Sequence, residues 1–231
     1  MSHLVILGGK ICYSVIAGIL AGHAAVYVFN KIPAQWLSDY GQEPSEALKD
    51  KFTRRIKGYP WKWTFSGFFM AGSVRLVFFD WAYAAAALAL CWALLMIFLA
   101  DKKYGIVPDQ FVVLTAISAL GFIPFHGGET LSPLWGALLG GGVMLLSALL
   151  GKLIFKKETL GMGDVKLFAA IGLALGSRGT LTVLVLSAVA SSVIFSILLL
   201  AKKIKRADML PLGPYICGAA IFYAVIIRPL L

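Results

Sequence analysis

The sequence predicts an all-α polytopic membrane protein with about eight transmembrane helices. Two observations support this fold class. Of the 231 residues, 60% are hydrophobic and only 14% are charged, whereas soluble domains contain about 45–50% apolar and about 25% charged residues. The mean hydropathy is +0.86. A chain of this length cannot hide so much apolar surface from water, so the composition excludes the ordinary soluble classes.

Eight apolar segments form the candidate membrane spans. A helix needs about 20 mostly apolar residues to cross the hydrocarbon of a bilayer. The expected spans are 4–29, 62–79, 82–100, 110–125, 134–155, 164–178, 180–201 and 209–228. The only sizeable polar region is 30–62, so we expect a single membrane domain over 1–231 with this segment as a loop between the first and second helices.

Three of these segments need separate justification. The first, 4–29, has no basic start and is long enough to span, so we expect a retained helix rather than a secretory signal. The second contains Arg75, which we expect to extend toward the membrane surface or to pair with Asp80. The sixth, 164–178, is the shortest, and the distribution of basic residues supports it.

Basic residues are concentrated in every second connection between the expected spans. The formal net charge is +10, and 17 of the 21 Lys and Arg residues lie in the connections 30–62, 101–109, 152–166 and 201–208. This alternation holds only if the sixth span is counted. By the positive-inside rule these connections are cytoplasmic and both termini are extracytoplasmic. The charge is therefore explained by topology and by contact with anionic lipid, and no nucleic-acid partner is expected.

The three cysteines do not form a metal-binding pattern. Cys12, Cys91 and Cys217 lie far apart in apolar segments, and no C-x-x-C pair occurs. A thiolate zinc site needs closely spaced cysteine ligands. We expect these residues to be small packing groups and predict no metal site.

Two aspartates are expected at the same membrane face. Asp101 ends the third expected span in "MIFLADKKYGIVPDQ", and Asp164 begins the sixth, 63 positions later. The chain between them crosses the membrane twice, so both lie on the cytoplasmic side. If they meet, the two carboxylates share one proton, as in an aspartyl protease. One activates water while the other donates to the scissile carbonyl, and neither role is assigned to one residue.

Two alternatives to catalysis stay open for these acids. An aspartate at a helix N-terminus can simply stabilise the helix dipole. Ionisable residues inside a membrane can also line an ion path, as in a small ion-coupled transporter. Against a transporter, both acids lie toward one face, and the sequence has no pair of corresponding broken helices.

Glycines precede the second aspartate in "ETLGMGDVKLFAA" (158–170). Gly161 and Gly163 permit a positive φ and a close backbone approach. We expect the chain to unwind just before Asp164, so that an extended substrate can lie beside the carboxylate. The pattern lacks G-x-G-x-x-G and a preceding strand, so it does not predict nucleotide binding.

Four stretches together resemble the type IV prepilin peptidases, a family of G-x-G-D membrane aspartyl proteases. "GMGDVKL" (161–167) resembles the family signature G-x-G-D-x-K-L, and "DKKYGIVPD" (101–109) resembles the segment with the first catalytic Asp seven residues before a Pro. "GHAAVYVFNKIP" (22–33) is similar to the exit of the family's first helix, and "LPLGPYICGAA" (210–220) to the opening of its last. The resemblance covers nearly the whole chain.

The resemblance implies cleavage of the short basic leader of type IV prepilins and of the pseudopilins of type II secretion. It implies that Asp101 and Asp164 are the catalytic pair in an inner-membrane protein with a cytoplasmic active site, and that proteolysis needs no cofactor. Membrane lipids are further expected partners, and no oligomeric state is predicted. The residues expected to position the substrate or to support the pair are Gly161, Gly163, Lys166, Pro108 and Asp109.

Many family members also N-methylate the new N-terminus with S-adenosylmethionine. Such members often carry two C-x-x-C pairs in the first cytoplasmic loop, whereas 30–62 has no cysteine here, and Val26 replaces an expected Asn. The resemblance therefore implies S-adenosylmethionine only if methylation is retained. A related G-x-G-D protease, like the archaeal preflagellin peptidases, is the alternative enzyme.

Overall fold

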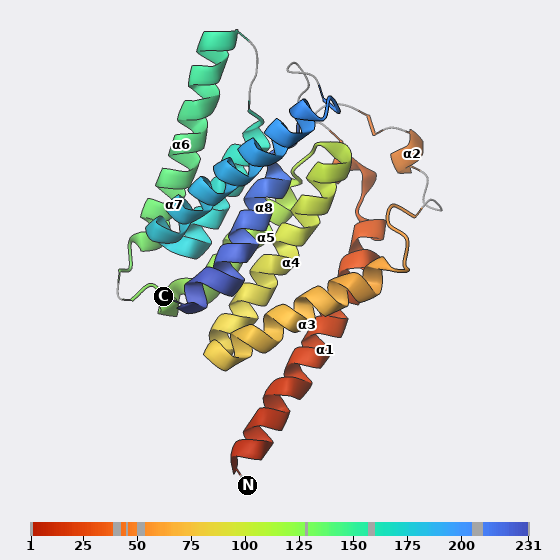
Figure 1. Ribbon diagram of the computed structural model, residues 1–231, viewed down its shortest axis with the longest axis vertical. Helices are drawn as coiled ribbons and strands as arrows, with labels where there is room; N and C mark the ends of the chain where they lie inside the picture. The colour runs from red at the N-terminus through yellow and green to blue at the C-terminus, as the bar shows by residue number, and fades with distance from the viewer. Residues whose placement is uncertain are drawn as a thin grey trace.

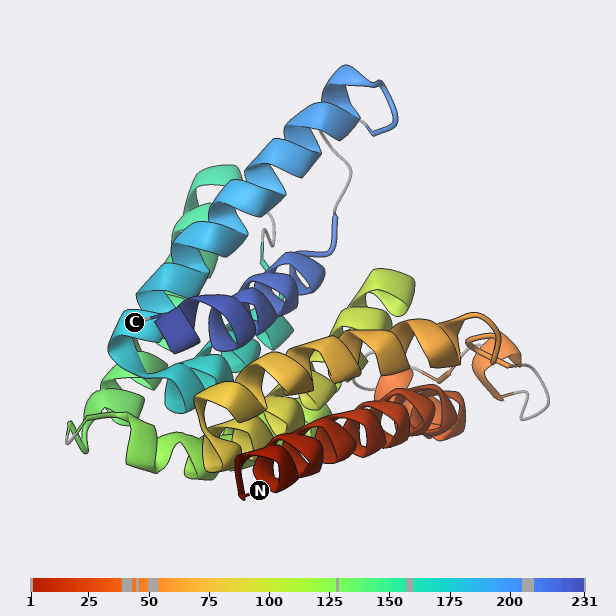
Figure 2. The same cartoon turned by 60° about the horizontal axis from the view of Figure 1, so that its bottom comes forward.

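The computed structural model describes residues 2–38, 43–44, 46–49, 54–127, 129–156, 160–204 and 210–230. These residues form helices and no strand, as Figures 1 and 2 show, which confirms the all-α prediction. The long helices are α1 (Ser2–Lys31), α3 (Trp61–Phe79), α4 (Trp81–Tyr104), α5 (Asp109–Ser118), α6 (Ser132–Phe155), α7 (Met162–Leu200) and α8 (Gly213–Phe222). The short elements are η1 (Ala34–Leu37), α2 (Glu46–Lys49), η2 (Ala119–Phe125), η3 (Tyr223–Ile227) and η4 (Arg228–Leu230).

Five helical segments of the described chain are long and apolar enough to cross a membrane. They are Val5–Lys31, Trp81–Tyr104, Ser132–Ile154, Met162–Leu200 and Gly213–Leu230. The expected spans 62–79 and 110–125 correspond to α3 and to α5 with η2, which are helical but outside this set. The chain is therefore a helical membrane protein, while the count of eight spans and the sidedness of the termini stay predictions.

The sixth and seventh expected spans form one long helical element with a break. Inside α7, Gly176 has φ 70° and ψ −177°, which is not a helical conformation. In both views the residues before the break and those after it form two arms of a V (Figures 1 and 2). The sequence placed this boundary near 179, so the prediction was three residues late.

Two helix pairs flank the bundle, and glycines bring their backbones into contact. A Cβ atom built on Gly22 of α1 would lie 2.2 Å from the backbone nitrogen of Ser66 on α3. A Cβ on Gly136 of α6 would lie 2.3 Å from the carbonyl oxygen of Gly172 on α7. Small residues at such crossings are the usual way in which membrane helices approach closely.

The centre of the molecule is α4, which packs between α3, α5 and α8. Figure 1 shows the C-terminal end of α4 at the same edge of the molecule as the beginning of α8. Near the opposite edge, Arg75 donates from Nε to the Val225 carbonyl at 3.0 Å and from Nη2 to that of Ile226 at 3.2 Å. Both carbonyls lie near the end of the last helix, where backbone acceptors lack helical partners, and Pro229, four residues after Val225, has no N–H to donate.

Of the two expectations for Arg75, the pairing with Asp80 was wrong. The Asp80 side chain instead accepts a hydrogen bond from the backbone N–H of Tyr83 at 2.9 Å and caps the start of α4. An aspartate is among the preferred residues at this position, since it satisfies a backbone donor that has no helical partner.

Candidate active site

Asp101 lies in the last turn of α4 and is 5% exposed. The helix continues past it to Tyr104, so the expectation that Asp101 ends the helix was short by three residues. Gly105 terminates α4 in the left-handed conformation with φ 68°, and its N–H donates to the Asp101 carbonyl at 2.8 Å. A glycine at this position adopts a positive φ without steric cost. The chain can therefore turn sharply into the segment that leads to Pro108.

Asp164 is the third residue of α7 and is 9% exposed. Its backbone N–H donates to the Gly161 carbonyl at 3.1 Å. Gly161 precedes the helix with φ −72° and ψ 139°, and Gly163 is already helical. Neither glycine has a positive φ, so the expected unwinding directly before Asp164 was wrong.

The close approach expected of these glycines is found at Gly163. A Cβ atom there would lie 2.9 Å from the Cβ of Val107, in the segment between α4 and α5. Real side chains do not tolerate that distance, so a glycine is needed where the two segments cross. At Gly161 the nearest atom to an added Cβ is Oδ2 of Asp164 at 3.7 Å, which is ordinary contact.

The fold brings Asp101 and Asp164 close enough to interact electrostatically. They come from α4 and α7, and the first residue of α8, Gly213, packs against Asp101. A Cβ on Gly213 would be 2.6 Å from Oδ2 of Asp101, and the Gly213 backbone N–H is oriented toward this carboxyl group. Within the described part of the chain, that Oδ2 atom has no hydrogen-bond partner. Three helices thus enclose the pair.

Sequence reasoning missed Gly213 as part of the site. The residue stands in "LPLGPYICGAA", which carried the resemblance but no assigned role. The available signal was a glycine at the start of an apolar helix, directly before Pro214. That signal identifies a helix start, but it does not reveal that an aspartate from another helix packs against the glycine.

A polar cavity of about 510 Å³ opens beside Asp164. All five residues expected to support the pair line it: Pro108, Asp109, Gly161, Gly163 and Lys166. η1 also contributes to its lining, through Gln35 and Trp36. Asp101 is not among the lining residues, so the two aspartates differ in their access to this cavity.

Lys166 and Asp109 form an ion pair at this cavity. The Lys166 Nζ donates to Oδ2 of Asp109 at 2.9 Å and to Oδ1 at 3.1 Å, with side-chain exposures of 46% and 33%. The pair links α7 to the start of α5 across the connection that Gly163 contacts. Exposed pairs of this kind contribute little to stability, about 0–1 kcal/mol. Its main effect is to orient the two segments that border Asp164.

Comparison with known proteins identifies the family. Residues 88–197 match the type IV leader peptidase family. A prepilin leader peptidase/N-methyltransferase of Stutzerimonas stutzeri is 33% identical over 144 residues, which are 61% of this chain and 49% of that protein. One of Xanthomonas campestris pv. campestris is 32% identical over 151 residues, covering 63% of this chain and 51% of that protein. This chain thus spans about half the length of these relatives.

A shorter relative is covered more completely. The leader peptidase HopD of Escherichia coli is 32% identical over 127 residues, which are 54% of this chain and 81% of that protein. No solved structure matches the chain. Both aspartates lie inside the matched range 88–197, on α4 and α7, which each pack against α8. The chain belongs to the type IV leader peptidase family.

Proposed function

We propose that this protein is an aspartic endopeptidase of the cytoplasmic membrane that removes the short basic leader of type IV prepilins or pseudopilins. One observation carries the proposal. Two almost fully buried carboxylates, Asp101 and Asp164, come from different helices and lie within electrostatic reach of each other, and Asp164 lines a polar cavity. Burying two carboxylates costs folding free energy, so such pairs occur mainly at functional sites. Relatives named leader peptidases support the same reading.

The chemistry follows from the two carboxylates sharing one proton. Two negative charges this close repel, so the pair holds one proton between its members. The ionised member removes a proton from a water molecule, which attacks the scissile carbonyl. The protonated member donates to the carbonyl oxygen, and collapse of the tetrahedral intermediate then releases the leader. Because the pair titrates as a unit, these two roles belong to the pair.

The polar cavity is the proposed site of the leader. It is bordered by the ion pair of Lys166 with Asp109 and by the glycines before Asp164. Glycines leave the backbone of this wall accessible to an extended peptide. The leader would lie along the segments 105–109 and 161–164, with the scissile bond beside Asp164.

S-adenosylmethionine is a candidate cofactor because several relatives are named N-methyltransferases. The acidic groups of the polar cavity do not fit it. Of the acidic groups that line the polar cavity, Asp109 is paired with Lys166 and Asp164 belongs to the carboxylate pair. Neither is left to bind the amino or ribose groups of such a cofactor. We therefore derive no methyl-transfer step.

The test is cleavage of a purified prepilin in membranes by the wild type and by two isosteric variants. Asp101→Asn and Asp164→Asn should each lower the cleavage rate by about 10²–10⁴-fold, because each removes one member of the proton-sharing pair. Glu129→Gln is the matched control, since it removes an exposed carboxylate that does not line the polar cavity, and it should retain most of the activity.

Three outcomes would contradict the proposal in different ways. If Asp101→Asn or Asp164→Asn cuts normally, that residue is not part of the catalytic pair. If the wild type cuts no prepilin or pseudopilin but cuts a preflagellin, the substrate class is wrong. If it cuts neither, the carboxylates serve another purpose, and ion transport becomes the next function to measure.

A further inference from the structure

The end of α1 leads directly to the lining of the polar cavity. α1 ends at Lys31, and Pro33 is the N-cap of η1. η1 contributes Gln35 and Trp36 to the lining, and Ser38 directly after it also lines the cavity. Contacts that fix the end of α1 therefore also fix this part of the cavity.

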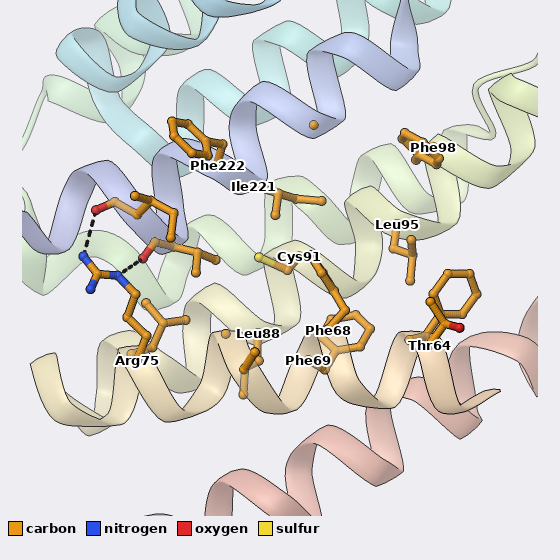
Figure 3. Close-up of a pocket in the computed structure, with 17 residues that line it drawn as sticks. Thr64, Phe68, Phe69, Arg75, Leu88, Cys91, Leu95, Phe98, Ile221 and Phe222 are labelled. Carbon is orange, nitrogen blue, oxygen red and sulfur yellow. Dashed lines mark hydrogen bonds between the residues drawn. The ribbon is translucent and has the colours of Figure 1, made fainter. Parts of the chain in front are cut away.

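Arg55 binds the carbonyl groups at the end of α1. Its Nη1 atom donates to the Phe29 carbonyl at 3.2 Å and to the Ile32 carbonyl at 2.5 Å. In a continuing helix the Phe29 carbonyl would accept from the residue four positions on, but that residue is Pro33, which has no N–H. One guanidinium nitrogen carries two N–H groups, so it can serve both carbonyls. Arg75 makes the same kind of contact at the opposite edge of the molecule, with two carbonyls near the end of the last helix (Figure 3).

Two further contacts hold the segment that contains Arg55. The Asn30 side chain accepts from the Ile56 N–H at 2.9 Å and donates to the Ile56 carbonyl at 3.0 Å. The Lys103 Nζ donates to the Arg55 carbonyl at 2.6 Å, and Lys103 lies in the last turn of α4, two residues after Asp101. We call Asn30, Arg55, Ile56 and Lys103 the Arg55 clamp. It joins the end of α1 to the turn that carries Asp101.

η1 is also supported from below, and it presents one unused polar group to the cavity. Leu37 is 1% exposed, and the Trp36 ring meets that of Phe111 on α5 edge-on, with 6.2 Å between the ring centroids. Gln35 is exposed, and its amide makes no hydrogen bond within the described part of the chain. An amide offers both donors and an acceptor, as an extended peptide backbone does. Gln35 can therefore bind such a backbone.

We propose that η1 is part of the substrate site, that the Gln35 amide binds the backbone of the leader, and that Arg55 is the positioning residue that holds η1 there. This inference rests on the proposed function, in which the leader lies along 105–109 and 161–164. Residues of both segments line the same cavity as Gln35, whereas Arg55 does not line it. Loss of Arg55 should therefore weaken substrate binding and leave the reaction at the carboxylate pair intact.

Cleavage kinetics with a purified prepilin test the two roles. Arg55→Gln removes the guanidinium but keeps the backbone carbonyl that Lys103 binds. It should raise KM about tenfold and change kcat by less than about twofold, because the site loses preorganisation and not its reacting groups. Arg55→Lys, which keeps the charge and can donate to one carbonyl, should give an intermediate KM. Gln35→Met removes the amide at nearly constant size and should raise KM about fivefold.

Arg54→Gln is the matched control for the Arg55 variants. It makes the same change of charge at the neighbouring position, where the side chain is exposed and forms no hydrogen bond with any described residue. It should leave KM and kcat as in the wild type. Equal effects of Arg54→Gln and Arg55→Gln would mean that only the charge matters, and they would overturn the positioning role.

Hydrogen exchange provides a readout that does not need cleavage. The backbone amides of 34–38 should exchange about tenfold faster in Arg55→Gln than in the wild type, while those of α5 stay unchanged. In an Asp164→Asn background, bound prepilin should slow the exchange of 34–38. Faster exchange throughout the Arg55→Gln protein would show a general loss of stability and would overturn the positioning role.

The two readouts separate this inference from the proposed function. If the wild type cuts no prepilin but bound prepilin still protects 34–38, the assignment of η1 stands and the peptidase is refuted. If the wild type cuts prepilin while Arg55→Gln changes neither KM nor the exchange of 34–38, the positioning role is overturned and the peptidase stands. An unchanged KM for Gln35→Met would overturn the contact assigned to Gln35.

Discussion

At the scale of single residues, the burial of Asp101 depends on a neighbour that has no side chain. Gly213→Ala would place a methyl carbon 2.6 Å from Oδ2 of Asp101. Either the carboxylate or the first turn of α8 must shift, and a displacement of about 1 Å at a catalytic group can cost about 10²-fold in rate. We expect cleavage by Gly213→Ala to fall by about that factor while the protein stays folded.

Gly218→Ala on the same helix is the control for this prediction. Its added methyl group meets no atom within 4 Å, and it changes the backbone freedom of α8 in the same way. Prepilin cleavage by both variants is measured in the same membranes, with the amount of inserted protein as the reference. Equal activity of the two variants would mean that Asp101 does not need the space that Gly213 leaves.

His126 lies at the other edge of the molecule, outside the spanning segments. Its Nε2 atom is buried and has no partner among the described residues, and Arg228 lies nearby. Burial lowers the pKa of His126 below the usual 6.5, and the Arg228 charge lowers it further, while Glu129 opposes this shift. The unfolded chain therefore takes up a proton at a higher pH than the folded protein. The free energy of unfolding falls as the pH drops below about 6.5.

The measurement is the apparent Tm of the detergent-solubilised protein between about pH 8 and about pH 5. The wild type should lose stability toward the acid end. His126→Asn, which cannot be protonated, should lose less over the same range, although its Tm at the alkaline end can be lower. If Tm falls equally with decreasing pH in both proteins, His126 does not contribute to the acid sensitivity.

At the scale of elements, apolar segments could be recognised from the sequence, but their interruptions could not. Hydropathy located every long helix, because a membrane selects for runs of apolar side chains. The break in α7 depends on Gly176, and the sequence offers several glycines nearby. Only the packing of Ser132 and His126 against Gly176 distinguishes this position. Likewise, Arg75 bonds to two carbonyls near the end of the last helix, a contact between distant segments that the sequence analysis did not predict.

The break in α7 provides a prediction about stability. Gly176 has φ 70° and ψ −177°, a conformation that is essentially limited to glycine, and an added Cβ would lie 2.7 Å from Oγ of Ser132. Gly176→Ala should lower the free energy of unfolding by about 1–3 kcal/mol. Gly142→Ala on α6 meets no atom within 4 Å and should be neutral or slightly stabilising. Unfolding of both variants in a denaturing detergent checks this, and similar losses would mean that the break tolerates a side chain.

At the scale of the whole molecule, the expected topology places Asp101 and Asp164 at one membrane face, and so it allows them to meet without requiring it. Their mutual burial was not predictable, since it requires α8 to fold over them from more than 100 positions beyond Asp101. The alternating basic connections predicted which helix ends lie together, and Figure 1 shows the ends of α4 and α6 and the beginning of α8 at one edge of the molecule. A sequence pattern thus locates charges relative to the membrane but does not specify side-chain contacts between helices.

The same charge pattern leads to a prediction of sidedness that the length of α7 supports. Its 39 residues would extend about 58 Å as one straight helix, about twice the hydrocarbon thickness. We therefore expect the break at Gly176 to separate two spans, with Arg178 outside and Lys203 inside. In a Cys12→Ser background, an impermeant maleimide added to intact cells should label Arg178→Cys and Glu129→Cys, whereas Lys57→Cys and Lys203→Cys should react only after the membrane is opened. Labelling of Lys203→Cys from outside would overturn the eight-span topology, and with it the assignment of the carboxylate pair to the cytoplasmic face.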